Sequence, residues 1–244
     1  MRPTRLAVVL VAHGSKDPRA ATSTRALAEA VAGAHPEWEV HDSYLDHAGP
    51  RPLDVLGWLS AAGHRHAVLV PLLLTAAYHG RVDVPAVATA ARAAGLRIDV
   101  EIADVLGPVS RSLVDGLIRR LPEVELDAVV LAAAGTRNAA ARSTVADAAA
   151  ALGRRLGVPC EVAYASAAPP TAAVAVSALR AAGASRVGMA AYFLAPGLLY
   201  DVAAESALSA GAVAIAPPLG DAPELVRLVT ARVGSALSRR SIAA

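Results

Sequence analysis

The chain has very little cysteine and few aromatic side chains, and each shortage excludes something. Cys160 is the single cysteine, so an intrachain disulfide and a metal or iron–sulfur site made only of cysteines are excluded. Aromatic residues make up 3% of the 244 residues, whereas apolar residues make up 55%. We therefore expect a core of many small contacts among Ala, Val and Leu, with Cys160 as a small buried residue.

Long hydrophobic runs and basic clusters are also missing. No run approaches the roughly 20 apolar residues of a membrane span. The run Leu6–Ala12 behind Arg2 and Arg5 is at the lower limit for a signal peptide, so a first buried strand is expected there instead. The 23 basic residues, of which only Lys16 is a lysine, form no patch typical of a nucleic-acid-binding face. We expect a cytoplasmic protein that binds neither membrane nor nucleic acid.

Short apolar runs alternate with Ala-rich helical stretches along the chain. Apolar strands that are each followed by a helix are typical of parallel sheets covered on both faces, so the predicted class is α/β, doubly wound. Strands are expected at Leu6–Val11, Val40–Leu45, Ala67–Pro71, Arg97–Ile102, Asp127–Ala132, Cys160–Tyr164, Arg186–Ala190 and Ala212–Ala216. Helices are expected at Ala20–Ala32, Pro52–Ala62, Pro85–Ala94, Val109–Leu121, Ala140–Leu156, Thr171–Ala182, Val202–Ser209 and Pro223–Ser238.

The second half of the chain repeats the first. Residues 128–137 (AVVLAAAGTR) echo residues 7–16 (AVVLVAHGSK), and residues 181–187 match residues 61–67 in nearly the same register. Separate matches at a similar offset indicate an internal duplication. We predict two similar doubly wound domains, residues 1–124 and residues 125–244.

Three loops of the first half carry the residues with the most useful chemistry. They are His13–Arg19 after the first strand, Asp46–Pro50 after the second, and Leu72–Asp83, which contains His79, after the third. Ligands of parallel α/β sheets bind beyond the carboxyl ends of the strands, where these loops meet. Each loop therefore brings a metal ligand or a proton acceptor to one edge.

The second half lacks these groups. Its aligned positions hold Ala134, a residue near Ser166 and a residue near Leu199. Histidines that only filled space in a core would be needed in both halves. The absence of these ionisable groups from the second half predicts one site per chain. We expect this site in the first half, with the second half serving as a wall or lid.

These motifs resemble the sirohydrochlorin chelatase family, the small class II chelatases of sirohaem and cobalamin synthesis. The resemblance rests on Leu10–Arg19 (LVAHGSKDPR), Tyr44–Asp46 (YLD), Val70–Leu74 (VPLLL) leading to His79, and Arg81–Asp83 (RVD). The second half resembles the fused degenerate copy of the longer members, with Tyr192–Gly197 (YFLAPG) as its landmark.

The resemblance implies a lyase that inserts a divalent metal, iron or cobalt, into sirohydrochlorin, with the metal as substrate and no organic cofactor. The residues that match the family's two histidines, and that would bind the metal, are His13 and His79. Neutral imidazole binds such metals and accepts protons near neutral pH. Asp46 stands where the family usually has Glu, and it would take up a proton, orient a histidine or offset metal charge. An Asx-type turn is the alternative for Asp46.

Substrate carboxylates have candidate partners in the same loops. Free N–H groups at the start of a helix favour anions, and arginine matches carboxylates bidentately. The candidate substrate-binding residues are Ser15, Lys16, Arg19 and Arg81. The alternatives are a helix N-terminus capped by Ser15 or Asp17, and an Arg81 that only orders its loop. His47, beside Asp46, is interpreted as a solvated loop residue.

Other functions remain alternatives. A non-catalytic tetrapyrrole or metal carrier on the same scaffold would keep both histidines and show no turnover. A hydrolase using Ser15 lacks the Gly-x-Ser-x-Gly elbow, and a phosphotransferase would need glycine-rich phosphate loops that the sequence does not contain. Iron and cobalt, and the sirohaem and cobalamin pathways, stay open. We expect a monomer in which the two halves pack together.

Overall fold

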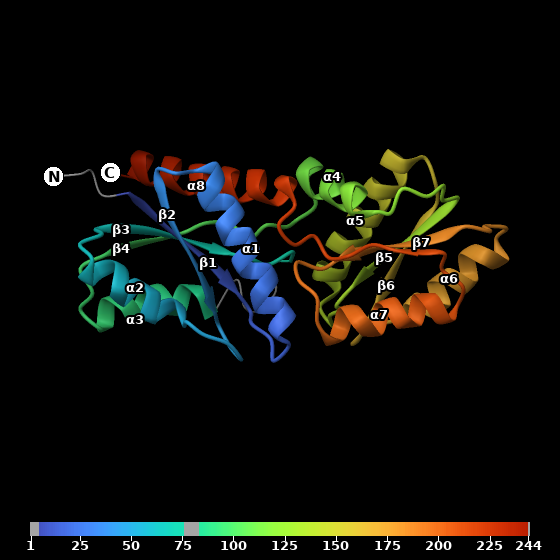
Figure 1. Ribbon diagram of the computed structural model, residues 1–244, viewed down its shortest axis with the longest axis horizontal. Helices are drawn as coiled ribbons and strands as arrows, with labels where there is room; N and C mark the ends of the chain where they lie inside the picture. The colour runs from blue at the N-terminus through green and yellow to red at the C-terminus, as the bar shows by residue number, and fades with distance from the viewer. Residues whose placement is uncertain (1–4, 76–82, 244) are drawn as a thin grey trace. The chain divides into compact units, whose positions relative to one another are not determined.

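The computed structural model describes residues 5–75 and 83–243. The chain divides into two compact units (Figure 1). Met1–Gly107 and Leu225–Ala244 form the first unit, and Pro108–Glu224 form the second. Each unit contains one parallel sheet with helices on both faces. The predicted α/β, doubly wound class is confirmed.

The sheet of the first unit has four parallel strands. They are β1 (Leu6–Ala12), β2 (Trp38–Tyr44), β3 (His66–Pro71) and β4 (Asp99–Ile102), in the order β2-β1-β3-β4. The chain leaves β1 toward β2 and then returns to the other side of β1 for β3. This reversal is a topological switch point, and in such sheets a crevice opens at the carboxyl ends of the strands beside it.

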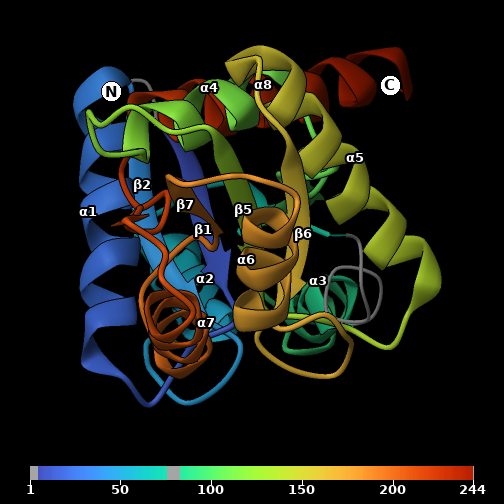
Figure 2. The ribbon, with the colours of Figure 1, turned by 90° about the vertical axis from the view of Figure 1, so that its right-hand side faces the viewer.

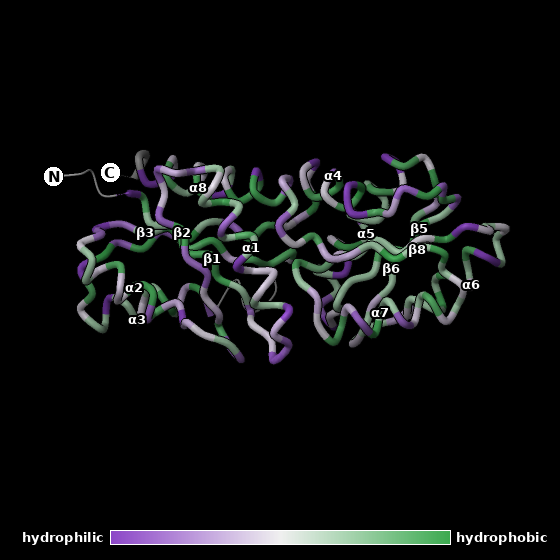
Figure 3. The backbone as a smooth tube through the Cα atoms, viewed as in Figure 1, coloured by the Kyte–Doolittle hydropathy of each residue, from purple (hydrophilic) through white to green (hydrophobic). Residues whose placement is uncertain are grey.

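Helices bury both faces of this sheet. Ala7, Val9 and Val11 of β1 face the core beneath α2 (Pro52–Ala61) and α3 (Val84–Ala93). The other face is covered by α1 (Pro18–Ala34) and α8 (Pro223–Ala243), which His35 and Thr230 join through a hydrogen bond of 2.8 Å between Nε2 and Oγ1. Burial on both sides explains why the central strands β1 and β3 are nearly continuous apolar runs. The edge strand β2 carries Glu39, His41 and Asp42, and it is largely purple in Figure 3.

The second unit repeats this plan. Its strands are β5 (Ala128–Ala133), β6 (Cys160–Tyr164), β7 (Val187–Tyr192) and β8 (Ala214–Ile215), in the order β6-β5-β7-β8. Its helices are α4 (Arg111–Arg120), α5 (Ala139–Leu156), α6 (Ala172–Ala181) and α7 (Leu198–Ser209). In Figure 2, α6 and α7 lie on one side of these strands and α4 and α5 on the other. Equal strand orders confirm the predicted duplication of the fold.

Each predicted strand and helix corresponds to an observed one. The strand Cys160–Tyr164 has the predicted bounds, and every other element differs at one or both ends. The last helix reaches Ala243, whereas the prediction stopped at Ser238. Ion pairs hold its last turns, with Arg239 Nη1 2.9 Å from Asp104 Oδ2 and Arg240 Nη2 3.2 Å from Asp99 Oδ2. Basic residues at a helix C-terminus are also favoured by the helix dipole. The prediction missed this extension because the partners lie far away in the sequence.

The compact units are not the same division as the two sequence halves. The helix α4 lies in the first half of the sequence but belongs to the second unit. The helix α8 lies in the second half of the sequence, but most of it belongs to the first unit. Arg119 Nε donates to both carboxylate oxygens of Glu224 within the second unit, at 3.0 and 2.9 Å. In the first unit, Arg232 Nε of α8 donates to the carbonyl oxygen of Val105 at 2.7 Å. The division at residue 124 therefore stays a prediction about the repeat in the sequence.

No helix in the described ranges 5–75 and 83–243 has the length and apolar character that crossing a bilayer requires.

Candidate functional site

His13 and Asp46 lie on neighbouring loops at the carboxyl edge of the first sheet. Two hydrogen bonds continue the pairing of β1 and β2 beyond the ends of the strands. The backbone N–H of Leu45 donates to the carbonyl oxygen of Ala12 at 2.9 Å, and that of Asp46 donates to the carbonyl oxygen of His13 at 2.8 Å. The register of the two strands therefore brings these predicted catalytic residues together.

Gly14 allows this close approach of the two loops. Its φ is +94°, a left-handed conformation that glycine adopts without steric cost. A Cβ atom at this position would lie 1.8 Å from the carbonyl oxygen of Asp46. Only glycine fits between His13 and Ser15.

His13 and Asp46 line one cavity of about 460 Å³ in the first unit. Arg51 and Asp83 complete its polar side. Its apolar side comes from α2 and α3, with Leu53, Val87 and Ala90 among the lining residues. A cavity with a few polar groups beside an apolar wall suits a ligand that has an apolar ring and charged substituents.

The carboxyl group of Asp46 is held in its ionised form. The backbone N–H of His47 donates to Oδ1 at 2.8 Å, and this contact is the largest of the causes that lower the pKa of Asp46 below its usual 3.8. The charges of His47 and Arg51 act in the same direction. Arg51 Nη2 lies 3.5 Å from Asp46 Oδ1, and Arg51 Nη1 donates to the carbonyl oxygen of Leu45. Asp46 is thus a carboxylate at neutral pH, fixed from two sides.

His47, predicted to be a solvated loop residue, is exposed and also lies beside His13. Its ring centroid lies 6.3 Å from that of His13, and the two rings are perpendicular. Its φ is +60°, in the left-handed region that is uncommon outside glycine but in which Asn, Asp and His are enriched. The sequence did not predict that the backbone would turn here and bring the imidazole near His13. Glycine or asparagine would have suggested such a turn, and neither stands at this position.

The second unit repeats the backbone of this edge without its chemistry. Gly135 has a φ of +98°, and a Cβ there would lie 1.9 Å from the carbonyl oxygen of Ser166. The backbone N–H of Ser166 donates to the carbonyl oxygen of Ala134 at 3.1 Å, and Ala167 has a φ of +63°. Ser166, Ala134 and Ala167 occupy the positions that Asp46, His13 and His47, respectively, hold in the first unit. The second unit therefore keeps the loops but carries neither imidazole nor carboxylate at these positions.

Some predicted site residues lie elsewhere or outside the described residues. His79 and Arg81 fall outside the described residues, and Asp83 is the first described residue after them. Asp17 caps α1 by accepting from the backbone N–H of Arg19 at 2.9 Å, and the Arg19 guanidinium binds the same carboxylate. These contacts lower the pKa of Asp17, with the Arg19 side chain as the largest cause.

Ser15 also belongs to this capping arrangement, because its Oγ accepts from the backbone N–H of Asp17 at 3.1 Å. Ser15, Lys16 and Arg19 are not among the described residues that line the cavity of His13. Their role in substrate binding stays a prediction.

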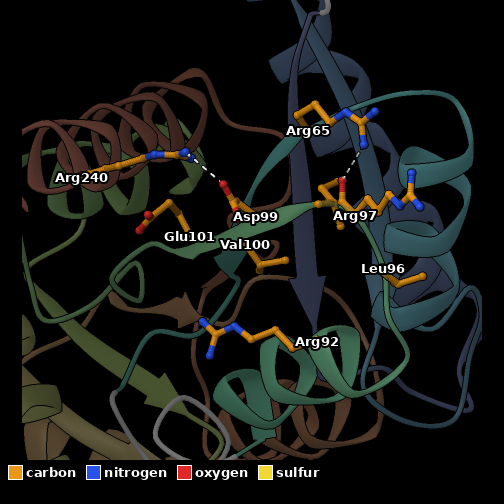
Figure 4. Close-up of a pocket in the computed structure, with 9 residues that line it drawn as sticks. Arg65, Arg92, Leu96, Arg97, Asp99, Val100, Glu101 and Arg240 are labelled. Carbon is orange, nitrogen blue, oxygen red and sulfur yellow. Dashed lines mark hydrogen bonds and ion pairs between the residues drawn. The ribbon is translucent and has the colours of Figure 1, made fainter. Parts of the chain in front are cut away.

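A second cavity of the first unit, about 590 Å³, is larger but contains none of the predicted residues. It follows the edge strand β4, and Figure 4 shows Arg65, Arg92, Arg97 and Arg240 around it. Arg240 binds Asp99, and Arg65 Nη1 donates to the carbonyl oxygen of Arg97 at 3.5 Å. Charged side chains along an exposed edge strand hinder pairing with another chain. In β4 these charged side chains are Asp99 and Glu101, whereas the four arginines lie on neighbouring segments. The cavity of His13, which contains two of the predicted catalytic residues, is the candidate site.

The candidate site is poor in metal ligands by the standard of a permanent metal centre. Within the described part of the chain, no group of three or more His, Cys, Asp or Glu residues is arranged to hold a metal ion. Permanent zinc sites normally use four protein ligands. From this cavity the His13 imidazole and the Asp46 carboxylate can each contact an ion or a proton.

Comparison with known proteins decides the family. The sequence model of the CbiX family matches residues 7–124 and again residues 128–236. The chain belongs to the CbiX family. The resemblance expected from the sequence motifs is thereby confirmed, and this CbiX chain contains two copies of the family's domain.

Solved structures support the same fold. SirB from Bacillus subtilis with Fe³⁺ is 21% identical, with 95% of each chain covered and a TM-score of 0.80. The sirohydrochlorin chelatase SirB from Bacillus subtilis subspecies spizizenii, in complex with cobalt, has the same identity and coverage and a TM-score of 0.75. A CbiX described as the terminal enzyme of sirohaem biosynthesis in denitrifying bacteria is 19% identical, with 95% of this chain and 99% of the other covered and a TM-score of 0.62. No curated protein matches the sequence.

Proposed function

We propose that this CbiX protein inserts a divalent metal, iron or cobalt, into sirohydrochlorin. The observation that carries the proposal is the contrast between two matching edges. The first unit places His13 and Asp46 on one cavity, whereas the same backbone in the second unit carries Ala134 and Ser166. Membership of the CbiX family and the shared fold of SirB, which has been solved with Fe³⁺ and with cobalt, agree with it.

The residues of the cavity supply what metal insertion requires. The ion must lose water ligands, and two pyrrole protons must leave the ring. Neutral imidazole replaces water on the ion and accepts protons near neutral pH, which we assign to His13 and, in the third loop, to His79. Asp46, already ionised, offsets the charge of the incoming ion or orients an imidazole.

The same cavity accommodates the tetrapyrrole in chemical terms. Its apolar wall of α2 and α3 residues suits the macrocycle, and Arg51 adds a cation at its polar side. Arginine binds carboxylates through a bidentate fork. We assign further carboxylate contacts to Ser15, Lys16, Arg19 and Arg81.

We further propose that the protein acts in the cytoplasm as a monomer. The single cysteine agrees with a reducing compartment, where disulfides are rare. Both copies of the repeat are present in one chain, so a second chain is not needed to supply the other copy. Light scattering coupled to size-exclusion chromatography measures the mass directly, and a mass of twice 24.7 kDa would reject the monomer.

The function is tested by absorbance spectroscopy of sirohydrochlorin mixed with the purified chain and Fe²⁺, Co²⁺ or Ni²⁺. Metal insertion changes the absorption of the macrocycle, so the rate above the protein-free background is the readout. The proposal expects turnover with Fe²⁺ or Co²⁺ and its loss in His13→Ala and His79→Ala.

Ser166→Ala is the matched control, because it changes the second-unit equivalent of Asp46 and should leave the rate unchanged. Binding of sirohydrochlorin with no turnover for any of the metals would reject the enzyme and favour a carrier.

A further inference from the structure

The His47 imidazole lies beside that of His13, which lines the candidate site. The two rings come from loops that follow different strands, β1 and β2, and their centroids are 6.3 Å apart. The His47 side chain is 39% exposed. An ion can therefore reach it from solvent, and the tetrapyrrole cavity lined by His13 is immediately adjacent.

The spacing of the two rings suits one shared metal ion. Bonds of about 2.0–2.1 Å from an ion to one nitrogen of each imidazole bring two ring centroids to about 5–6.5 Å apart. The observed 6.3 Å lies within that range. This spacing corresponds to two imidazoles on nearly opposite sides of one ion.

The Asp46 carboxylate lies beside the His47 ring. Its Oδ2 lies 3.5 Å from His47 Nε2, which is an ion-pair distance. A carboxylate at one ring nitrogen fixes the tautomer and raises the basicity of the other nitrogen. In His47, Nε2 is the nitrogen nearer to this carboxylate, so we assign metal binding to Nδ1.

The backbone at position 47 does not depend on the imidazole. The N–H of Ala48 donates to the carbonyl oxygen of Asp46 at 2.7 Å, which closes a γ-turn around His47. In the second unit, the N–H of Ala168 donates to the carbonyl oxygen of Ser166, also at 2.7 Å, around Ala167. An alanine thus occupies the same turn in the same protein, so the histidine side chain is available for chemistry.

We propose that His47 is a metal ligand that, together with His13, receives the divalent ion before its transfer to the macrocycle. The proposal rests on the proposed function only for the fate of the ion; binding of the ion itself is tested separately. Two imidazoles leave most of the coordination sphere to water, so the ion is held weakly and can leave.

The test titrates the full chain with Co²⁺ alone, without tetrapyrrole, and follows the visible absorption of the ion together with the heat of binding. Wild type, His13→Ala, His47→Ala and the double variant are compared. His47→Ala has a structural precedent in Ala167, and His47→Asn gives a second variant because asparagine tolerates a positive φ. His41→Ala is the matched control, since it removes a part-exposed imidazole that does not line the cavity.

Each single variant at His13 or His47 is expected to weaken Co²⁺ binding by about 10-fold or more. The double variant should be little worse than either single variant, because both remove the same shared ion. His41→Ala should bind as wild type does. Wild-type affinity in both His47→Ala and His47→Asn would overturn the proposal, as would fully independent losses at His13 and His47.

The outcome is separable from that of the proposed function. In the insertion assay, His47→Ala should raise the KM for Co²⁺ more than it lowers kcat, because it removes a site that collects the ion. A wild-type chain that binds Co²⁺ through both histidines but never inserts it would reject the proposed function and keep this inference. Normal insertion with Co²⁺ binding that is insensitive to His47 would reject this inference alone.

Discussion

Gly14 lies so close to Asp46 that a Cβ atom at Gly14 would be 1.8 Å from the Asp46 carbonyl oxygen. The contact joins the loop that carries His13 to the loop that carries the carboxylate. The position of the site therefore depends on a residue that has no reactive group.

Gly14→Ala is expected to destabilise the protein and to abolish metal insertion, because it displaces the Asp46 loop. Gly63→Ala is the control, since Gly63 has the same φ of +94° but open space around its Cβ position. The free energy of unfolding should fall by about 1 kcal/mol in the control because of backbone strain. In Gly14→Ala it should fall by about 2 kcal/mol more because of the clash. Urea unfolding measures both. Equal losses in the two variants would show that the loops are not held this closely.

Asp46→Asn is expected to lower kcat for insertion by about 10–100-fold. Because the pKa of Asp46 lies below 3.8, the group stays ionised from neutral pH down to about pH 5, so the ratio of wild-type to variant rates should be constant over that interval. Any stability that the carboxylate contributes is lost only as the pH falls below 3.8.

Asp46→Glu, which restores the residue usual in the family, should keep most of the activity. A rate ratio that falls toward one near pH 6 would contradict the low pKa of Asp46.

His66 is expected to make the fold sensitive to mild acid. Its Nε2 is buried and has no hydrogen-bond partner within the described ranges. Burial lowers the pKa of His66 below its usual 6.5, and Arg240 adds to the effect. When the pH falls through 6.5 the unfolded chain takes up the proton first, so the free energy of unfolding decreases.

Thermal unfolding at about pH 7.5 and about pH 5.5 measures this effect. The melting temperature of wild type should fall between the two, and that of His66→Gln should fall less. Identical losses in the two proteins would exclude His66 as the cause.

Arg119→Ala is expected to destabilise the second unit by about 2 kcal/mol, because it removes two charge-assisted hydrogen bonds from the buried carboxylate of Glu224. Arg111→Ala is the control. Its ion pair with Asp115 spans 3.7 Å, and the Arg111 side chain is 89% exposed, so its loss should cost under about 0.5 kcal/mol. Urea unfolding compares the two, and equal effects would contradict the account of how α4 is attached.

Much of the fold was predictable because its causes are local. The run Leu6–Ala12 is apolar at every position since both faces of β1 are covered, and the same holds for β5. The positions of His13 and Asp46 after two such strands were then enough to predict a shared edge. The repeat in the second half of the sequence showed which residues to compare. The structure confirms Ala134 and Ser166 as the equivalents of His13 and Asp46.

The features of the fold and the site that the sequence did not predict depend on contacts between residues far apart in the chain, and no local pattern shows such contacts. The periodicity of α8 predicts a helix but does not say which sheet it covers; the bond from Arg232 to the carbonyl of Val105 does. The γ-turn at His47 comes directly after the backbone hydrogen bond from Asp46 to His13. A histidine by itself does not predict a positive φ at its position. Ser15 and Asp17 were both possible caps of α1, and only the backbone geometry selects Asp17.

The most direct test of the central claim is the rate at which the chain inserts Co²⁺ into sirohydrochlorin in a single turnover, compared between wild type and a folded His13→Ala variant. If metal passes through the edge of the first unit, wild type should convert the macrocycle and the variant should fall to the protein-free rate. A folded His13→Ala variant that inserts Co²⁺ as fast as wild type would contradict the claim.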